Sequence, residues 1–284
     1  MTGQMIARAT HETRFEFGRN WKSFLDRMTD ERLEQAQRSI LDFTGFESLE
    51  GMSFVDVGCG SGLFSWAAYR LGARSIVSFD YDPWSVACCE ELRRRAGGAD
   101  RWELFEGSVL DDGFMRSLGR FDLVYSWGVL HHTGNMWRAL DNAMGLVTEP
   151  GCLYIAIYNK KIGWRGSRYW EWRKKLYCRL PSIGKKLLFG LHAAKFARSK
   201  LRRGKNPFRS AREYDSVRGM DWHTDTLDWI GGYPYEYATI SEISDHVRRS
   251  DPQMELVNVS GVHGLGCNQY LFRRDDSESK TGGP

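Results

Sequence analysis

The sequence predicts an α/β fold with a doubly wound, mostly parallel sheet flanked by helices. Short apolar runs typical of strands alternate with helical patterns from Ser53 to Tyr158. The first of these runs enters a glycine-rich turn that opens a helix. Strands that alternate with helices are joined by right-handed crossovers and pair in parallel. The length of 284 residues, with 42% hydrophobic and 27% charged residues, suits one such domain plus a substantial insertion.

Residues 1–50 precede this core and are expected to form a helical segment. Aromatic residues punctuate its polar first half, and a helix with a loose 3.6-residue period follows from Thr29 to Phe43. Thr29 or Asp30 can cap that helix because both side chains accept backbone N–H bonds.

The glycine turn follows the first strand, Phe54–Val57, as Gly58-Cys59-Gly60-Ser61-Gly62. Glycine lets the backbone bend sharply and approach a ligand without a Cβ in the way. The N–H groups of the helix start face whatever lies over the turn. A dinucleotide fingerprint would place its third glycine at position 63, which is Leu. The spacing is therefore G-x-G-x-G, with the acidic Asp56 just before it.

A second strand, Ser75–Phe79, ends in Asp80, 20 residues after Gly60. A carboxylate at the end of the second strand can accept hydrogen bonds from both hydroxyls of a ribose. Asp80 therefore indicates a nucleoside without saying which one. Asp82 follows on the same loop and is expected to cap the helix that begins at Pro83.

The fourth strand, Phe121–Trp127, continues into Gly128-Val129-Leu130-His131-His132, and this stretch and the glycine turn carry a family resemblance. Both resemble class I S-adenosylmethionine-dependent methyltransferases, most closely the small-molecule enzymes near those of ubiquinone biosynthesis. The resemblance implies a seven-stranded sheet whose last strand is antiparallel, and S-adenosyl-L-methionine as cofactor with S-adenosyl-L-homocysteine as product. The cofactor-binding residues it implies are Asp56, Gly58, Cys59, Gly60, Gly62, Asp80, Tyr81, Ser108, Val109, Ser126 and Trp127.

One position departs from the family pattern. The third strand, Glu103–Glu106, is followed by Gly107 and then Ser108, where the family usually has an acidic residue facing the adenine amino group. A serine hydroxyl can contact adenine, but more weakly. The resemblance also implies that residues 1–50 fold over the cofactor as a lid; simple packing of their aromatic side chains on the core is the alternative.

The strand end at His131-His132 lies beside the transferred methyl group in the family. A neutral His132 there can take a proton from an acceptor hydroxyl, or alternatively cap a helix or bond to backbone. The other candidates on the acceptor side are Tyr158, His223 and His263. Adjacent histidines do not chelate one metal easily, and no Cys/His spacing supports zinc, so no metal is expected.

A basic insertion follows the fifth strand, Cys152–Tyr158, and spans residues 159–238. Between Tyr158 and Gly219 there are 19 Lys and Arg but only 3 Asp and Glu. The pattern predicts two helices, the second amphipathic and basic. Three interpretations stay open: a cap over the acceptor pocket with a solvated basic face, adsorption of residues 160–212 to an anionic membrane, or RNA binding.

Residues 219–237 mix Trp, Tyr, Asp, His and Gly without a period, which predicts a structured loop at an acceptor pocket or an aromatic plug. A helix capped by Ser241 and two closing strands, Met254–Val259 and Gln269–Arg273, complete the core over 239–274. Their hairpin loop, Ser260–Asn268, would lie at the ligand edge of the sheet and contains His263. Residues 275–284 are polar and small and are expected to be a disordered tail.

Composition limits the cellular setting and leaves the acceptor open. The six cysteines have no framework spacing, no apolar run approaches ~18 residues, and no signal core opens the chain, so a cytoplasmic location is expected. The expected function is methyl transfer from S-adenosylmethionine to an oxygen or nitrogen of a small acceptor: a secondary metabolite, a sugar or a quinone-like compound, with an anionic acceptor left open. The alternatives are an RNA (tRNA) methyltransferase and a non-catalytic S-adenosylmethionine-binding protein. The sequence does not define the oligomeric state.

Overall fold

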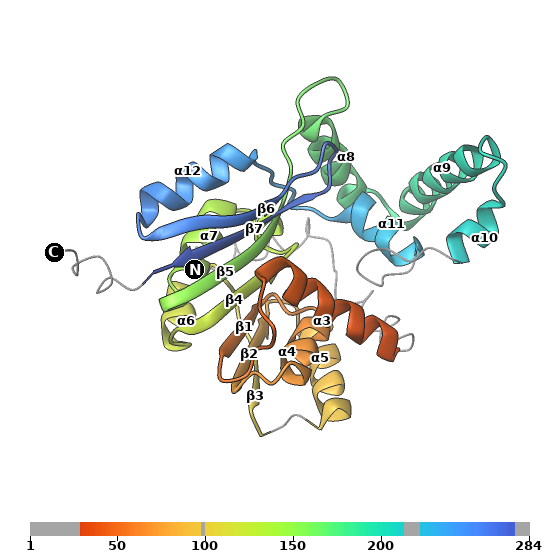
Figure 1. The fold of residues 1–284 in the computed structure, drawn as a ribbon. Coiled ribbons are helices and arrows are strands. Elements are labelled where there is room, and N and C mark those ends of the chain that lie inside the picture. The colour runs from red at the N-terminus through yellow and green to blue at the C-terminus, as the bar shows by residue number, and fades with distance from the viewer. Residues whose placement is uncertain (1–28, 98–99, 213–221, 276–284) are drawn as a thin grey trace, which may run out of the picture.

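The structure, a computed structural model, describes residues 29–97, 100–212 and 222–275. A seven-stranded sheet with the order β3-β2-β1-β4-β5-β7-β6 forms its centre, and helices cover both faces (Figure 1). Residues 1–28 of the expected lid (1–50) and residues 276–284 of the expected tail (275–284) lie outside the described residues.

The strands confirm the predicted fold class. All pairs from β3 to β5 are parallel, and β7 runs antiparallel to both of its neighbours, β5 and β6. The strand bounds are β1 Ser53–Val57, β2 Ser75–Asp80, β3 Trp102–Glu106, β4 Phe121–Trp127, β5 Val147–Tyr158, β6 Met254–Ser260 and β7 Cys267–Arg274. The chain order reverses between β1 and β4, which opens a crevice at their carboxyl ends.

Two hydrophobic cores hold the helices onto the sheet, one on each face. One core joins α3 and α4 to the sheet through side chains such as Leu33, Ile40 and Leu63. The other joins α7 and α12 through Leu140 and Val247. The helices, with one 3-10 turn (η1), are α3 Asp30–Thr44, α4 Leu63–Arg70, α5 Pro83–Ala96, α6 Asp112–Ser117, η1 Leu130–His132, α7 Met136–Met144, α8 Ser167–Arg179, α9 Ser182–Leu201, α10 Pro207–Arg212, α11 Trp222–Gly231 and α12 Ile240–Ser250.

Helix caps confirm two predictions and correct a third. Thr29 caps α3 by accepting the N–H of Arg32, and Asp82 caps α5 by accepting the N–H of Trp84. Ser241 was the wrong cap for α12. Thr239 begins that helix, because it forms a reciprocal capping box with Glu242 that satisfies two backbone N–H groups.

The insertion contains more helix than the sequence predicts. Residues 222–231 form α11, so the non-periodic loop expected there is wrong for this part, and α10 was not predicted. Thr226 and Ile230, one helical turn apart, are buried, and α11 packs against α8 and α9. Tertiary contacts thus stabilise a helix whose local pattern is weak.

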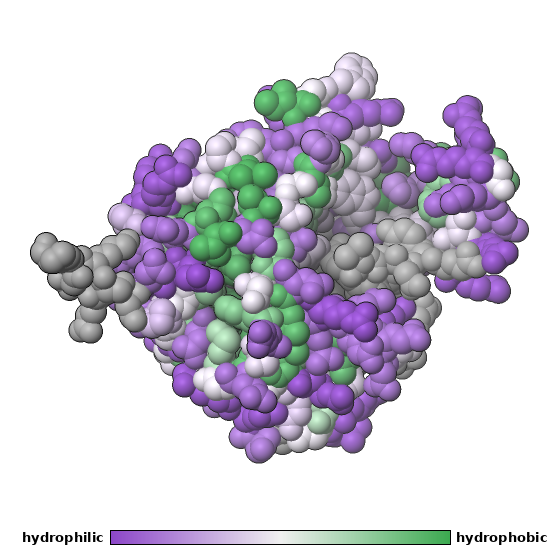
Figure 2. Space-filling model, in the orientation of Figure 1, coloured by the Kyte–Doolittle hydropathy of each residue, from purple (hydrophilic) through white to green (hydrophobic). Residues whose placement is uncertain are grey.

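The insertion extends away from the sheet, and α9 and α10 form its outer end (Figure 1). On the face shown in Figure 2, that end carries mostly hydrophilic side chains, whereas hydrophobic ones gather over β6 and β7. Within the described residues, none of the helices is both long enough and apolar enough to cross a membrane.

Candidate active site

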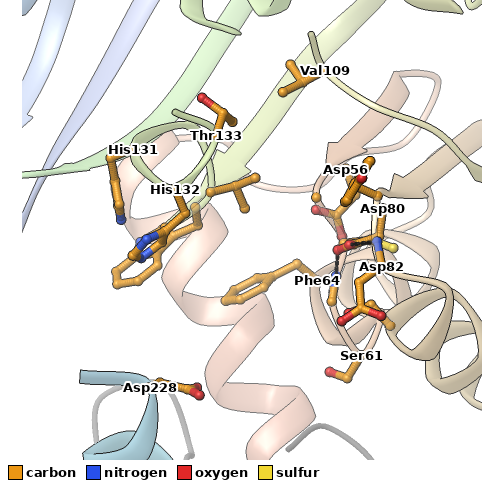
Figure 3. Close-up of a pocket in the computed structure, with 18 of the residues that line it drawn as sticks. Asp56, Ser61, Phe64, Asp80, Asp82, Val109, His131, His132, Thr133 and Asp228 are labelled. Carbon is orange, nitrogen blue, oxygen red and sulfur yellow. Dashed lines mark hydrogen bonds between the residues drawn. The ribbon is translucent and has the colours of Figure 1, made fainter. Parts of the chain in front are cut away.

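A cavity of about 360 Å³ lies at the carboxyl ends of β1, β2, β4 and β5 and extends to α11. One group of predicted residues lines it together: Asp56, Gly58, Cys59, Gly60, Asp80, Tyr81, Ser108, Val109, Trp127, His132 and Tyr158. In Figure 3, Asp56, Asp80 and Asp82 gather on one side, while His131 and His132 lie on the other. The cavity therefore has two chemically distinct ends, named here after the expected ligands: the donor end beside Asp56 and Asp80, and the acceptor end beside the histidines and α11.

The glycine turn is held by the neighbouring strand. The N–H groups of Gly58 and Cys59 both donate to the carbonyl of Phe79, at 2.9 and 3.0 Å. Gly58 has φ +75°, and a Cβ there would lie 2.3 Å from Cγ1 of Val129. Only glycine fits this position without displacing the cavity wall.

Two predicted cofactor residues support the wall without lining the cavity. Gly62 begins α4 with φ +84°, and a Cβ on it would lie 2.5 Å from Sγ of Cys89. The buried Ser126 donates its hydroxyl to the carbonyl of Val57 at 3.1 Å. Both residues fix the relative positions of the elements that surround the turn.

Asp80 is oriented by two backbone groups. Its Oδ2 accepts the N–H of Gly60 and its Oδ1 accepts the N–H of Asp82, each at 2.9 Å. Each carboxylate oxygen has a second lone pair that can accept a ligand hydroxyl. Burial raises the pKa of Asp80 to about 6, although these hydrogen bonds act in the opposite direction.

Asp56 ends a chain of buried hydrogen bonds. Trp102 Nε1 donates to Ser78 Oγ, Ser78 donates to Ser65 Oγ, and Ser65 donates to Asp56 Oδ2, over 2.8, 2.7 and 2.6 Å. Burial raises the pKa of Asp56 to about 7. The chain fixes this carboxylate beneath the glycine turn, a link that the sequence did not reveal.

The two histidines lie on η1 and have different hydrogen-bonding states. His132 Nδ1 lies 2.5 Å from the carbonyl oxygen of Pro234. A carbonyl only accepts, so Nδ1 carries the proton and the lone pair of the neutral ring is on Nε2. His131 is buried, and its Nδ1 accepts the N–H of Tyr158 at 3.3 Å.

A fully buried lysine lies behind the acceptor end. Lys174 of α8 donates to the carbonyl of Trp229, and its ammonium lies 4.6, 4.9 and 5.7 Å from the ring centres of Trp229, Tyr235 and Tyr158. Cation–π attraction favours the charged form, whereas burial lowers the pKa of Lys174 to about 7. The arrangement joins α8 to α11 and fixes two rings of the cavity wall.

Two predicted acceptor residues do not reach the cavity lining. His223 is exposed on α11 and its ring packs on Phe189, 4.9 Å between ring centres. His263 is exposed in the β6–β7 hairpin loop. Gly266 and Cys267, next in that loop, do line the cavity, so the predicted position of the hairpin at the ligand edge is confirmed.

Sequence reasoning missed several lining residues on the acceptor side. Asp225, Asp228, Trp229 and Tyr233 fall in the stretch that it associated with an acceptor pocket, but it did not single them out. The other lining residues not predicted are Leu63, Phe64, Phe79, Asp82, Ser85, Leu110, Tyr125, Thr133, Gly266 and Cys267. The i, i+3 spacing of Asp225 and Asp228, which is typical of one helix face, was the signal that could have identified these two residues.

The donor end fits an adenosine carrying an amino acid. Asp80 offers acceptors for ribose hydroxyls, and Asp56 adds a buried carboxylate next to the turn. The buried Asp56 and the half-buried Asp80 carboxylates complement an ammonium group and repel the pyrophosphate of a dinucleotide. Among the residues described, no three His, Cys, Asp or Glu side chains come together as a metal site.

Residues 55–153 match the family described as "Methyltransferase domain". The core of the chain is therefore a methyltransferase domain. The methyltransferase core is similar to the ribosomal protein L11 methyltransferase of Tolumonas auensis, with 39% identity over 143 residues, 48% of this chain and 47% of that protein. It is also similar to the ubiquinone biosynthesis O-methyltransferase of a Methylobacterium species, with 30% identity over 147 residues, 46% and 57% of the two chains.

The chain spans between 20% and 57% of the length of the first curated relatives that it matches. Among solved structures, PKMT2 from Rickettsia typhi in complex with S-adenosylhomocysteine has a TM-score of 0.56 at 13% identity, over 86% of this chain and 53% of that one. This likeness supports the methyltransferase fold. The named relatives act on different acceptors, so similarity leaves the acceptor of this chain undefined.

Proposed function

We propose that this protein is an enzyme that moves the methyl group of S-adenosylmethionine to an oxygen or nitrogen of a small-molecule acceptor. One observation carries the proposal: a single cavity joins the glycine turn and Asp80 at one end to His132 and the aromatic wall of Tyr158 and Trp229 at the other. A donor and an acceptor bound there would share one enclosed space.

The donor end would hold the cofactor through groups that are already oriented. Asp80 would accept the ribose hydroxyls, Asp56 would face the amino-acid end, and Ser108 with Val109 would contact the adenine. When bound, the cofactor supplies an electrophilic methyl group. The protein contributes alignment and water exclusion, which can supply up to ~7–11 kcal/mol of rate enhancement.

His132 would act as the general base for a hydroxyl acceptor. The Nε2 lone pair, set by the bond from Nδ1–H to the Pro234 carbonyl, would receive the acceptor proton as the new bond to carbon forms. The resulting imidazolium would keep its bond to that carbonyl, which stabilises the positive charge. An amine acceptor that is already neutral would need this base less.

The charges at the acceptor end favour a neutral or cationic acceptor. Asp225 and Asp228 of α11 line the cavity, and its described lining contains neither Lys nor Arg. The aromatic rings of Trp127, Tyr158 and Trp229 suit a flat or apolar body. A quinone-like compound, an amine-bearing metabolite or a sugar fits this combination better than the anionic acceptor that the sequence left open.

RNA is the second candidate acceptor because of the charge of the insertion. Between residues 159 and 212 there are 18 Lys and Arg, and Glu171 is the one acidic residue. Such a surface can neutralise phosphates and bind RNA in a salt-dependent manner. The acidic lining of the acceptor end argues against a nucleotide there, since like charges repel.

Labelled methyl transfer tests the proposal. The purified protein is incubated with isotopically labelled S-adenosylmethionine and cell extract, and the products are separated into lipid, small-molecule, RNA and protein pools. We expect label in a small-molecule or lipid pool. Label in RNA alone would replace this proposal with the second candidate, and donor binding without label in any pool would indicate a non-catalytic binding protein.

A further inference from the structure

Helix α9 presents a row of exposed aliphatic side chains, which we name the α9 stripe: Ile183, Leu187 and Leu191. They recur every four residues and therefore share one face of the helix. Their exposed fractions are 79%, 65% and 59%. The hydrophobic effect makes it unfavourable to expose three large aliphatic side chains in a row to water. Such a patch indicates a surface that binds a partner.

The α9 stripe is not the face that holds α9 to the rest of the protein. Phe189 and Phe196 pack on Trp222 of α11, with ring centres 5.8 and 4.8 Å apart. At 100° per residue, Leu187 and Leu191 point nearly opposite to Phe189. The helix is thus anchored by one face and leaves an aliphatic face outward.

The surface becomes strongly basic toward the C-terminal end of α9, where at 100° per residue Arg198 and Arg202 lie on the side of the α9 stripe. A surface depression there, which we name the basic hollow, is lined by Lys195, Arg198, Ser199, Arg202 and Arg203. Between residues 172 and 212 the sequence has no acidic residue. Four cations around one hollow are complementary to phosphate groups.

We propose that α9 docks on an anionic lipid bilayer, with the α9 stripe inserted at the level of the acyl chains and the basic hollow binding lipid phosphates. Interfacial helices combine an aliphatic face with basic residues in this way. Attraction between Lys or Arg and an anionic leaflet adds to the burial of the aliphatic face. The contact is peripheral, on the membrane surface.

A bilayer accounts for the observations better than RNA or a second copy of the chain. RNA binds through phosphate contacts and base stacking, and the aliphatic α9 stripe offers neither. A second copy docked on the same face would cover the aliphatic side chains, but it would offer the basic hollow no anionic partner from this part of the insertion, since residues 172–212 contain no acidic residue. An anionic bilayer can bury the aliphatic α9 stripe and bind the basic hollow through its phosphates at the same time.

Docking would also orient the methyltransferase core. α9 packs against α11, and α11 lines the acceptor end of the cavity. The acceptor end would therefore lie on the side of the molecule nearer the bilayer than the donor end. Membrane binding is independent of methyl transfer, so the two proposals can fail separately.

Vesicle co-sedimentation of the full chain tests the docking. We expect binding to vesicles of phosphatidylcholine with one quarter phosphatidylglycerol that is at least about tenfold tighter than to phosphatidylcholine alone, and weaker at 0.5 M salt. Ile183→Gln, Leu187→Gln and Leu191→Gln together should weaken it at least about tenfold. Lys195→Gln, Arg198→Gln, Arg202→Gln and Arg203→Gln together should weaken it by a similar factor.

Two control variants remove comparable side chains elsewhere. Val257→Thr with Val259→Thr removes exposed aliphatic surface from β6, and the set Arg70→Gln, Arg116→Gln, Arg248→Gln and Arg249→Gln removes four exposed positive charges. The vesicle affinity of both control variants should stay within about twofold of that of the unchanged protein. Equal binding to the two vesicle types would overturn the proposal. So would a dimer in sedimentation that the α9 stripe substitutions dissociate, or RNA binding that only the basic hollow substitutions abolish.

Discussion

The two ends of the cavity are built in different ways. At the donor end, neighbouring strands hold the site through backbone bonds, and the contact from Gly60 N–H to Asp80 spans only 20 residues. At the acceptor end, contacts cross the insertion: His132 and Pro234 are 102 residues apart, and Glu236 accepts the N–H groups of Gly134 and Met136 from a similar distance in sequence.

This difference means that substitutions can change the acceptor site more easily than the donor site. The donor end depends on glycine conformation and on carboxylates beside the strands, so few substitutions leave it intact. The acceptor end depends on side chains that α8 and α11 bring to the sheet, so changes in the insertion can alter the acceptor without altering the donor site. Substitutions at each end should therefore have separable effects.

The largest effect should come from removing the proposed base at the acceptor end. His132→Gln should lower the rate of methyl transfer to a hydroxyl acceptor by about 10²–10⁴-fold, because proton removal by a positioned base contributes this much. Donor affinity, measured by calorimetry, should stay the same. His263→Gln, an exposed histidine outside the cavity lining, is the control. Equal losses in both variants would remove His132 from the mechanism.

Gly58→Ala should disable the donor end. The left-handed φ and a Cβ within 2.3 Å of Val129 should together lower donor affinity by at least about 30-fold. Gly119→Ala is a matched control, since Gly119 also has positive φ (+81°) but no atom within 4 Å of its Cβ position. It should lose some stability while keeping donor affinity. A similar affinity for the two variants would show that the turn does not contact the donor.

Lys174→Met should change how stability depends on pH. Burial lowers the pKa of Lys174 to about 7, so between pH 7 and 10 the unfolded chain holds a proton that the folded chain lacks. Stability of the native protein should therefore rise with pH in that window, by up to about 1.4 kcal/mol per pH unit from this group. Chemical denaturation should show a flatter profile for Lys174→Met. Lys175→Met, at an exposed neighbour, should keep the native slope, and an unchanged slope in both would disprove the burial effect.

Asp80→Asn should weaken both donor binding and the glycine turn. Replacing one carboxylate oxygen by NH2 should weaken donor binding about tenfold, since a ribose hydroxyl would lose its partner. The free energy of unfolding at pH 8 should fall by about 1–3 kcal/mol, because the N–H of Gly60 or of Asp82 would lose its acceptor. Calorimetry and denaturation measure the two quantities, with the exposed Asp100→Asn as control. Unchanged donor affinity would contradict the ribose contact.

The smallest effect should be the pH dependence of donor binding. Burial raises the pKa values of Asp80 and Asp56 to about 6 and about 7, so both carboxyls gain protons as pH falls toward 5.5. Donor affinity should rise about threefold or more from pH 5.5 to 7.5 as they ionise. The free energy of unfolding of the ligand-free protein should change in the opposite sense. It should fall as the pH rises from 4 to 7, because over that range the folded chain binds more protons than the unfolded chain. A flat affinity profile would show that ionisation of these carboxyls is not coupled to binding.

Most of the residues that the sequence associates with the donor end line the cavity. The glycine spacing and the acidic residue at the end of the second strand depend on backbone conformation and strand order, which neighbouring residues specify. The family resemblance implied that Ser126 and Gly62 bind the cofactor, and the structure places them outside the cavity lining. The periodicity of a strand shows which residues alternate, but not which of them reach a ligand.

The acceptor end was predicted only as a region. The histidine pair was identified, yet the bond that fixes the His132 tautomer comes from Pro234, and no local pattern joins the two. Asp228 and Trp229 lie on a helix that the sequence did not predict, since packing against α8 and α9 stabilises it. His223 and His263 were chosen for their chemistry, but both are exposed.

The sequence by itself determined the parallel sheet, the glycine turn and the carboxylate beside it, because these follow from hydrophobic periodicity and the conformational freedom of glycine over short spans. Only the tertiary structure decided which face of the insertion closes the cavity and which is left outward on α9. Those outcomes depend on contacts between segments about 30 to 100 residues apart along the chain, where the free energy of packing outweighs local preference.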